Sequence, residues 1–260
     1  MKVILTGRGG TIGKVLVDFL LNNKIEVIYW DRNRVSISNF SQMEEFIISH
    51  HPDALIHLAA ITSFDTISRQ NSWQVNYEWT SELAWICNIC HIRFVFTSTS
   101  MVFTGNLQLP LSIDSIPDAE EGYGYEKRMA EKRIIYQNPD SIILRLGWQI
   151  DPKGLNTINH YCDTKMNQDG IIHANKNWYP SCSFLEDTVD VIYQSLAFDP
   201  GIYMINANKK WSFFEIVTEL NKYYDNQWII EPSYDIYLDN RMMDEKIKIN
   251  DLRFRLTGLT

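Results

Sequence analysis

Short apolar runs alternate with longer amphipathic segments along the first 150 residues of the chain. The apolar runs predict five buried strands, at Lys2–Thr6, Ile25–Trp30, Ala54–Leu58, Phe94–Ser98 and Ser141–Leu146. Between them, apolar residues recur at helical spacing and predict helices at Thr11–Asn22, Ser41–Ser49, Val75–Cys90 and Tyr123–Tyr136. This alternation is typical of an α/β fold with a doubly wound parallel sheet.

The pattern weakens in the second part of the chain. There the sequence predicts a loop at Gln168–Pro180, helices at Leu185–Phe198 and Phe213–Tyr224, and a strand at Gly201–Ile205. We therefore expect a Rossmann domain that binds a dinucleotide and a small C-terminal substrate-binding lobe. The expected bounds are residues 1–150 for the domain, with residues 185–205 returning to it, and residues 151–184 and 206–260 for the lobe.

Three glycines, Gly7, Gly10 and Gly13, fit the pattern G-x-x-G-x-x-G between the first predicted strand and the first predicted helix. Glycines in such a turn allow backbone N–H groups to approach a pyrophosphate at the start of a helix. The position of the turn therefore predicts a site for NADH or NADPH, which includes Thr11 and Ile12 of the first helical turn.

Residues just after the second predicted strand bear on the choice of cofactor. Asp31 suits the ribose hydroxyls of NAD. Arg32, together with Arg8 and Arg34, could instead meet the 2′-phosphate of NADP. The sequence leaves the choice between the two cofactors open.

Tyr123 and Lys127 are four residues apart on a predicted helix and so lie on one face of it. Thr99 directly follows the strand Phe94–Ser98, at the sheet edge where a cofactor would lie. A phenol has a pKa of about 10, and a nearby ammonium lowers it. We therefore expect Tyr123 to exchange a proton with the substrate, Lys127 to lower its pKa, and Thr99 to hold the substrate oxygen.

In this order along the chain, these segments resemble an extended short-chain dehydrogenase/reductase. More narrowly, they resemble the dTDP-4-dehydrorhamnose reductase family of nucleotide-sugar 4-ketoreductases. The matching segments extend over nearly the whole chain: Thr6–Gly13, Ala59–Thr62 through Asp65, Val75-Asn76, Ser98-Thr99 with Val102-Phe103 and Gly105, Tyr123-Gly124 with Lys127, Leu144-Arg145 with Trp148, Gly201–Tyr203 and Ser212–Glu215.

The resemblance implies NAD(P)H-dependent reduction of a nucleotide-linked 4-keto-6-deoxy sugar in deoxysugar or polysaccharide biosynthesis, with Thr99, Tyr123 and Lys127 as the catalytic set. It implies cofactor contacts from Leu58, Ala59, Ala60 and Thr97 as well as from Tyr123 and Lys127, and substrate contacts from Thr99, Ser100, Met101, Tyr123 and Trp148. Arg241 is a separate candidate for the substrate diphosphate, because an acidic chain needs a local cation there.

The chain departs from the family pattern at Ser100 and Met101, where the family has Asp and Tyr. Related 4,6-dehydratases have an Asp-Glu pair here, and fucose-type epimerase-reductases have a Cys in place of Met101; neither chemistry is possible with Ser and Met. A simple 4-ketoreductase needs only a hydride and the tyrosine proton. Two alternatives stay open: a nucleotide-sugar 4-epimerase, and a non-catalytic NAD(P)-binding regulatory subunit like the methionine adenosyltransferase beta subunit.

Composition limits the partners. The 260 residues carry a formal charge of −8, which disfavours binding to nucleic acid or to an anionic membrane. Four cysteines are too few for a disulfide scaffold, and the six histidines lack metal-ligand spacing, so we expect no metal. The first residues run directly into the glycine turn without a signal-peptide pattern, so we expect a cytoplasmic protein. A homodimer is one option for its assembly.

Overall fold

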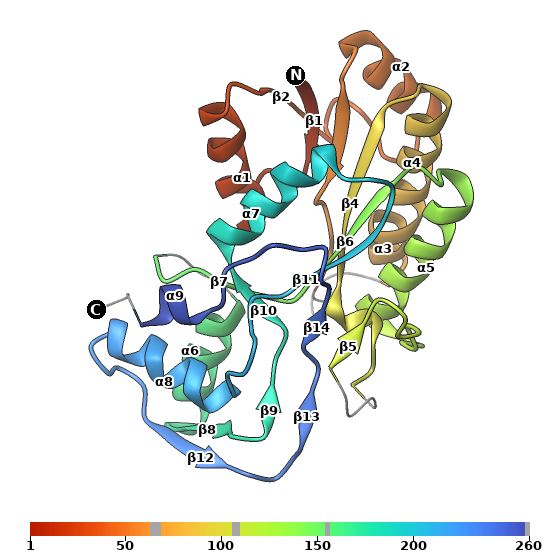
Figure 1. The fold of residues 1–260 in the computed structure, drawn as a ribbon. Helices are drawn as coiled ribbons and strands as arrows, with labels where there is room; N and C mark the ends of the chain where they lie inside the picture. The colour runs from red at the N-terminus through yellow and green to blue at the C-terminus, as the bar shows by residue number, and fades with distance from the viewer. Residues whose placement is uncertain (63–68, 106–109, 154–156, 258–260) are drawn as a thin grey trace. The chain divides into compact units, whose positions relative to one another are not determined.

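The computed structural model describes residues 1–62, 69–105, 110–153 and 157–257 (Figure 1). The chain divides into two compact units. Unit 1 comprises Met1–Phe103, Pro117–Arg145 and Ile192–Tyr203, and unit 2 comprises Thr104–Ile116, Leu146–Val191 and Met204–Thr260. None of the described helices combines the length and the apolar character needed to span a lipid bilayer.

A parallel sheet of six strands forms the centre of unit 1. Its order is β11-β6-β4-β3-β1-β2, with bounds β1 (Lys2–Thr6), β2 (Glu26–Tyr29), β3 (Ala54–His57), β4 (Arg93–Thr99), β6 (Ile142–Leu146) and β11 (Gly201–Ile205). Ile4 of β1 pairs with Ile28 of β2 on one side and with Leu55 of β3 on the other. The strand order reverses at β1, and ligands of such sheets bind outside the carboxyl ends of the strands at this point. The predicted doubly wound α/β fold is confirmed.

Helices cover both faces of this sheet, with α2, α4 and α5 on one face and α1 on the other (Figure 1). The elements are α1 (Thr11–Asn22), α2 (Phe40–His50), α3 (Arg69–Trp73), a π-helix η1 (Gln74–Trp79), α4 (Thr80–Ile89), a 3₁₀-helix η2 (Ser100–Val102), α5 (Gly122–Gln137) and a 3₁₀-helix η3 (Ser195–Ala197). The single helix predicted at Val75–Cys90 is therefore wrong in its first turn, where the chain forms the π-helix. π-Helical turns are rare in proteins, and those that occur often lie at functional sites.

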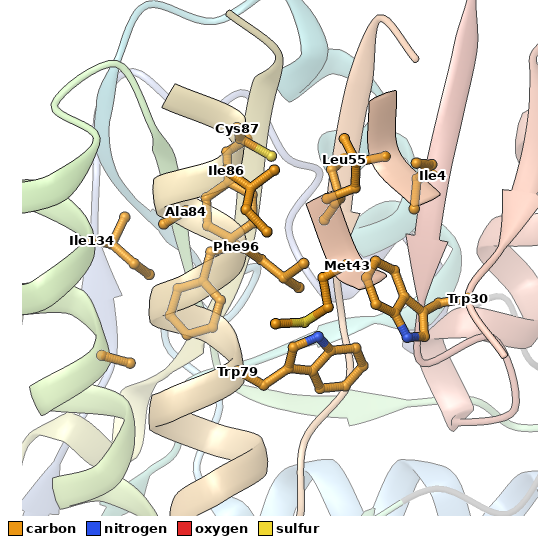
Figure 2. Packing of buried hydrophobic residues seen from close by; sticks show 14 of the residues in the cluster. Ile4, Trp30, Met43, Leu55, Trp79, Ala84, Ile86, Cys87, Phe96 and Ile134 are labelled. Carbon is orange, nitrogen blue, oxygen red and sulfur yellow. The ribbon is translucent and has the colours of Figure 1, made fainter. Parts of the chain in front are cut away.

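The core of unit 1 packs the three helices α2, α4 and α5 onto the sheet (Figure 2). Met43 of α2 and Leu55 of β3 are fully buried in it. The indoles of Trp30 and Trp79 lie 5.6 Å apart between their ring centroids. Burying one large apolar side chain stabilises a fold by about 1.5–3 kcal/mol, so this cluster fixes the position of η1 against the carboxyl end of the sheet.

The described residues of unit 2 form four parallel strand pairs and four helices. The pairs are β5 (Leu111–Ser112) with β14 (Met242–Met243), β7 (Trp148–Ile150) with β10 (Cys182–Phe184), β8 (Ile172–Asn175) with β12 (Ile230–Ser233), and β9 (Trp178–Tyr179) with β13 (Leu238–Asp239). The helices are α6 (Thr157–Asp169), α7 (Leu185–Gln194, ending in unit 1), α8 (Phe213–Tyr223) and α9 (Arg253–Leu256).

Two features of unit 2 differ from the sequence-based expectation. The loop predicted at Gln168–Pro180 is wrong, because β8 and β9 lie within it and pair with strands about 60 residues further along the chain. Residues 104–116 belong to unit 2, although the expected Rossmann domain takes in all of residues 1–150, because β5 in this stretch pairs with β14.

Candidate functional site

A cavity of about 680 Å³ opens at the carboxyl ends of β1, β2 and β3, within unit 1. Its size is within the usual range for small-molecule sites. The described residues that line it come from the glycine turn, the ends of β2 and β3, and helices α3 and η1: Gly7, Gly9, Gly10, Trp30, Arg32, Ile37, Leu58, Ala59, Ala60, Ile61, Asn71, Gln74, Val75 and Trp79.

Two of the turn glycines are required by close backbone packing. Gly7 has a φ of +75°, and a Cβ there would lie 2.7 Å from the backbone nitrogen of Ala59. A Cβ at Gly13 would lie 2.2 Å from the carbonyl oxygen of Gly7. No larger side chain fits at either position without moving the backbone, so Gly7 lets the turn pack on the loop that follows β3, and Gly13 lets the start of α1 pack on the turn itself.

Gly10 is the N-cap of α1, and its role is different. A Cβ there would meet only the Gly7 carbonyl oxygen, at 3.4 Å, so the fold does not require glycine. Among the described residues, no side chain caps this helix, and its first turn, with Thr11 and Ile12, contains no acidic residue. The open N–H groups and the helix dipole suit an anion such as a pyrophosphate.

The charged residues predicted to select the cofactor lie in different surroundings. Arg32 lines the cavity. The Asp31 carboxylate accepts the Asn33 N–H at 2.9 Å and lies 3.7 Å from the Arg34 guanidinium. The Arg8 guanidinium lies over the ring of Tyr29, 4.6 Å from its centroid. Of the three arginines predicted to meet a 2′-phosphate, Arg32 is therefore the one that lines the cavity.

The end of β4 and the start of α5 bring together the predicted catalytic segments. Thr99 is buried, and its Oγ1 accepts the Met101 N–H at 3.2 Å. A Cβ on Gly124 would lie 2.0 Å from the Met101 carbonyl oxygen, so α5 packs directly on the backbone of Ser100–Val102. The Met101 side chain itself is 54% exposed. Thr97, further back in β4, is buried and donates to the His57 carbonyl oxygen.

Lys127 is fully buried, one helical turn after Tyr123 on α5. Its ammonium lies 3.9 Å from the centroid of the Phe96 ring and 5.9 Å from that of Tyr123. Burial lowers the pKa of Lys127 from 10.5 to about 7, against the opposing charges of Glu131 and Glu126. The predicted pair therefore shares one face of the helix, as expected.

The pKa of Tyr123 runs against the sequence-based expectation. Burial, and then the negative charge of Glu126, raise this pKa above its ordinary value of 10. The expected lowering of this pKa is wrong for this structure, because burial of the phenol itself disfavours the phenolate. The phenol is therefore held in its protonated form.

Glu126 is a buried residue that the sequence analysis missed. One carboxylate oxygen accepts from the Ser72 hydroxyl and the other from the Asn76 side-chain amide, both at 2.7 Å. Asn76 in turn binds both backbone groups of Ile61, donating to its carbonyl oxygen at 2.8 Å and accepting its N–H at 2.9 Å. This network joins the helix that carries Tyr123 to the wall of the cavity. A charged residue on the buried face of a predicted helix was the available signal.

A second buried carboxylate on α5 has a cation as its partner. The Glu131 side chain accepts two hydrogen bonds from the Arg145 guanidinium, at 2.8 and 3.1 Å. Both residues are buried, and the guanidinium also lies over the ring of Phe103. Such a two-point pair is geometrically specific and fixes α5 to the end of β6.

The remaining predicted substrate residues lie in unit 2. Trp148 packs in an aromatic cluster, 5.2 Å from Trp178 and 6.0 Å from Phe213 between ring centroids. The Arg241 guanidinium is held by the Asp239 carboxylate, at 2.5 and 2.8 Å. Asp65, which belongs to a matching segment, lies outside the described residues.

The geometry can be compared with known proteins. The family described as the RmlD substrate binding domain matches residues 1–177. The chain belongs to this family. The RmlD-family chain is 25% identical to the spore coat polysaccharide biosynthesis protein SpsK of Bacillus subtilis over 224 residues, which cover 84% of the chain and 78% of SpsK. It is 28% identical to a dTDP-4-dehydrorhamnose reductase of Aggregatibacter actinomycetemcomitans over 171 residues, 65% of the chain and 58% of that enzyme's length.

Solved structures match the RmlD-family chain over nearly its whole length. The dTDP-4-dehydrorhamnose reductase of Bacillus anthracis str. Ames, in complex with NADP, gives a TM-score of 0.84 at 19% identity and covers 99% of this chain and 96% of that one. The Yersinia enterocolitica enzyme gives 0.81 at 20% identity, covering 99% and 98%. The likeness shows a shared fold. The resemblance to the dTDP-4-dehydrorhamnose reductase family of short-chain dehydrogenases/reductases is confirmed.

Proposed function

We propose that this protein is an NAD(P)H-dependent reductase of a keto group on a nucleotide-linked sugar, with a 4-keto-6-deoxy sugar as its substrate. The observation that carries the proposal is the Glu126–Asn76–Ile61 network, which joins the Tyr123 helix to the cavity at the glycine turn. Family membership and the names of the relatives, which include several dTDP-4-dehydrorhamnose reductases, support the same chemistry.

The residues present fit a dinucleotide. The uncapped start of α1 offers N–H groups to its pyrophosphate, and the space in front of Gly10 lets the pyrophosphate approach the backbone. Leu58, Ala59 and Ala60 give the cavity an apolar wall, and Arg32 offers a cation. When bound, the reduced nicotinamide supplies a hydride to the substrate carbon.

Tyr123 supplies the other half of the reduction. Its phenol donates a proton to the carbonyl oxygen while the carbon receives the hydride, so that the ketone becomes an alcohol and the phenol becomes a phenolate. Thr99 positions that oxygen by donating its hydroxyl proton to it, while the Met101 N–H that Thr99 Oγ1 accepts holds the hydroxyl in place. The buried Lys127 ammonium, 5.9 Å from the centroid of the Tyr123 ring, is a cation placed to offset the negative charge that forms on the phenol in this step.

Within unit 2, substrate recognition is assigned to Trp148 and Arg241; the predicted contacts of Ser100 and Met101 belong to unit 1. The aromatic cluster around Trp148 provides the flat apolar surface on which a sugar ring packs. Arg241 is proposed to bind the diphosphate of the substrate, and the Asp239 carboxylate orients its guanidinium. A homodimer and the absence of nucleic-acid binding stay predictions.

The proposal is tested by following NADPH and NADH oxidation with a panel of nucleotide 4-keto sugars. Reduction of one member, with a loss of about 10²–10⁴-fold in kcat for Tyr123→Phe, is the expected result. Tyr123→Phe keeps the ring, so its thermal unfolding and its NADPH affinity serve as the control. No turnover with any member of the panel would refute the reductase. Cofactor that stays bound through purification, together with interconversion of sugar alcohols, would indicate a 4-epimerase.

A further inference from the structure

Glu126 is only 6% exposed, and its partners are neutral. Both carboxylate oxygens accept hydrogen bonds, one from the Ser72 hydroxyl and one from the Asn76 amide, as an ionised carboxylate does. Within the described residues, no Lys or Arg nitrogen lies within 4.0 Å of it. Glu131, on the same helix, has such a partner in Arg145. Glu126 is therefore a buried charge that no direct ion pair compensates.

The position of Glu126 gives this charge a target. It lies one helical turn after Tyr123, so these two residues share a helix face, and it directly precedes Lys127 in the chain. Water screens charges weakly in a buried site, so the carboxylate acts on both neighbours. It disfavours the phenolate of Tyr123 and favours the ammonium of Lys127.

Other charged groups lie around the pair. Glu131 also favours the Lys127 ammonium, but its carboxylate is paired with the Arg145 guanidinium, 2.8 Å away, whereas Glu126 has no such pair among the described residues. Arg69, Glu120 and Glu121 line a pocket with Glu126. His57, on the neighbouring strand β3, is fully buried, and its pKa is held well below its ordinary value by burial and then by Lys127, so that it is neutral. The Lys127 ammonium itself contacts the ring of Phe96.

We propose that Glu126 is a positioning residue that sets the working pH range of the site, by holding a buried negative charge beside Tyr123 and Lys127. The inference rests on the proposed reductase function. In the direction of reduction the site has to begin with a protonated phenol and a charged lysine, and the Glu126 carboxylate favours both. Ser72 and Asn76 keep that carboxylate in place.

Charge and shape can be separated at this position. Glu126→Gln keeps the volume and the contacts, because Ser72 can accept from the new amide while its proton goes to the Arg69 carbonyl oxygen, 2.9 Å away. The Asn76 amide can still donate to the remaining side-chain oxygen. Glu126→Asp keeps the charge and shortens the side chain. Glu120→Gln removes a charge at an exposed position just before the same helix and serves as the control.

The test follows the ionisation of Lys127 in the protein without cofactor, by NMR of lysine labelled with ¹³C at Cε, with Lys127→Met identifying the signal. Lys127 is expected to titrate about one pH unit lower in Glu126→Gln than in the parent protein, and within about 0.3 unit of the parent in Glu126→Asp and Glu120→Gln. In the active enzyme, the alkaline limb of kcat/KM for reduction is expected to move to lower pH in Glu126→Gln alone.

An unchanged Lys127 titration in Glu126→Gln would overturn the inference, and so would an equal shift in Glu120→Gln. If Glu126→Gln fails to fold, Glu126→Asp decides, because a Lys127 titration more than about 0.5 unit from the parent would show that charge is not what matters there. The NMR titration needs no turnover. Failure of the keto-sugar assay would therefore refute the proposed function, whereas the NMR titration would still test the effect of Glu126 on Lys127.

Discussion

The Oγ1 atom of Thr6 lies 2.8 Å from Nδ1 of His57, and the hydrogen bonds on either side allow one arrangement of protons. Thr80 donates its one hydroxyl proton to the Val75 carbonyl oxygen, so its Oγ1 accepts the Nε2 proton of His57, 2.9 Å away. The neutral ring then accepts the Thr6 hydroxyl proton at Nδ1, while Thr6 Oγ1 accepts the Ala59 N–H at 3.2 Å. A neutral His57 thus connects the cavity wall after β3 to the π-helix.

Acidification is expected to destabilise the fold through His57. Burial lowers its pKa well below 6.5, so below pH 6.5 the unfolded chain binds a proton that the folded chain does not. Stability therefore falls as the pH drops from 6.5 toward the lowered pKa. Urea unfolding of the parent and of His57→Asn between pH 7 and pH 5 checks this. The parent should lose stability more steeply than the variant, and parallel curves would contradict the assignment.

Alkaline conditions are expected to stabilise the protein through Lys127. Its pKa is lowered from 10.5 to about 7 in the folded chain, so between these values the unfolded chain binds more protons, and the free energy of unfolding rises with pH. The full window corresponds to at most about 5 kcal/mol. Unfolding measured from pH 7 to 9.5 should show this rise in the parent and in Lys132→Met, an exposed control on the same helix, and lose it in Lys127→Met.

Gly10→Val is expected to lose dinucleotide affinity while keeping the fold. Its Cβ meets only the Gly7 carbonyl oxygen, at 3.4 Å, yet it stands where a pyrophosphate would approach the start of α1. A loss of at least about tenfold in NADPH affinity is expected, since two or more N–H contacts become inaccessible. Fluorescence titration measures it. Gly13→Val provides the contrast, because its Cβ at 2.2 Å from backbone should lower the unfolding temperature.

Arg32→Ala is expected to weaken NADPH binding by about 10–100-fold if the 2′-phosphate is read at the cavity, because one charge-assisted contact contributes about 1.5–3 kcal/mol. NADH binding should change much less. Arg34→Ala is the matched control, since its side chain is 86% exposed and lies beside Asp31. Equal losses for the two cofactors in Arg32→Ala would show that Arg32 does not read the phosphate.

The sequence predicted the sheet and its helices well where local pattern decides the structure. Apolar spacing placed α1 at Thr11–Asn22 with both bounds correct. The position of Tyr123 and Lys127 on one helix face followed from their spacing alone. By contrast, β8 pairs with β12, some 58 residues later, and no local pattern reveals a partner at that distance.

Glu126 was missed for a related reason. A glutamate in a predicted helix is most simply a solvent-exposed residue, and only the tertiary structure brings Ser72 and Asn76 to its two oxygens. The pKa of Tyr123 was misjudged because the expectation considered the charge of Lys127 and not the burial of both groups. Burial depends on packing, which spacing along the chain does not specify.

The contact between Gly124 and Met101 has a consequence for how such an enzyme can diversify. It uses the carbonyl oxygen of Met101, whereas the Met101 side chain is more than half exposed. Mutation can therefore exchange the side chain at 101 while the backbone that seats α5 stays intact. Position 124 has no such freedom, because any Cβ there collides with that carbonyl group. The side chain at position 101, the proposed sugar contact, can thus change without disturbing the backbone that seats the helix of Tyr123.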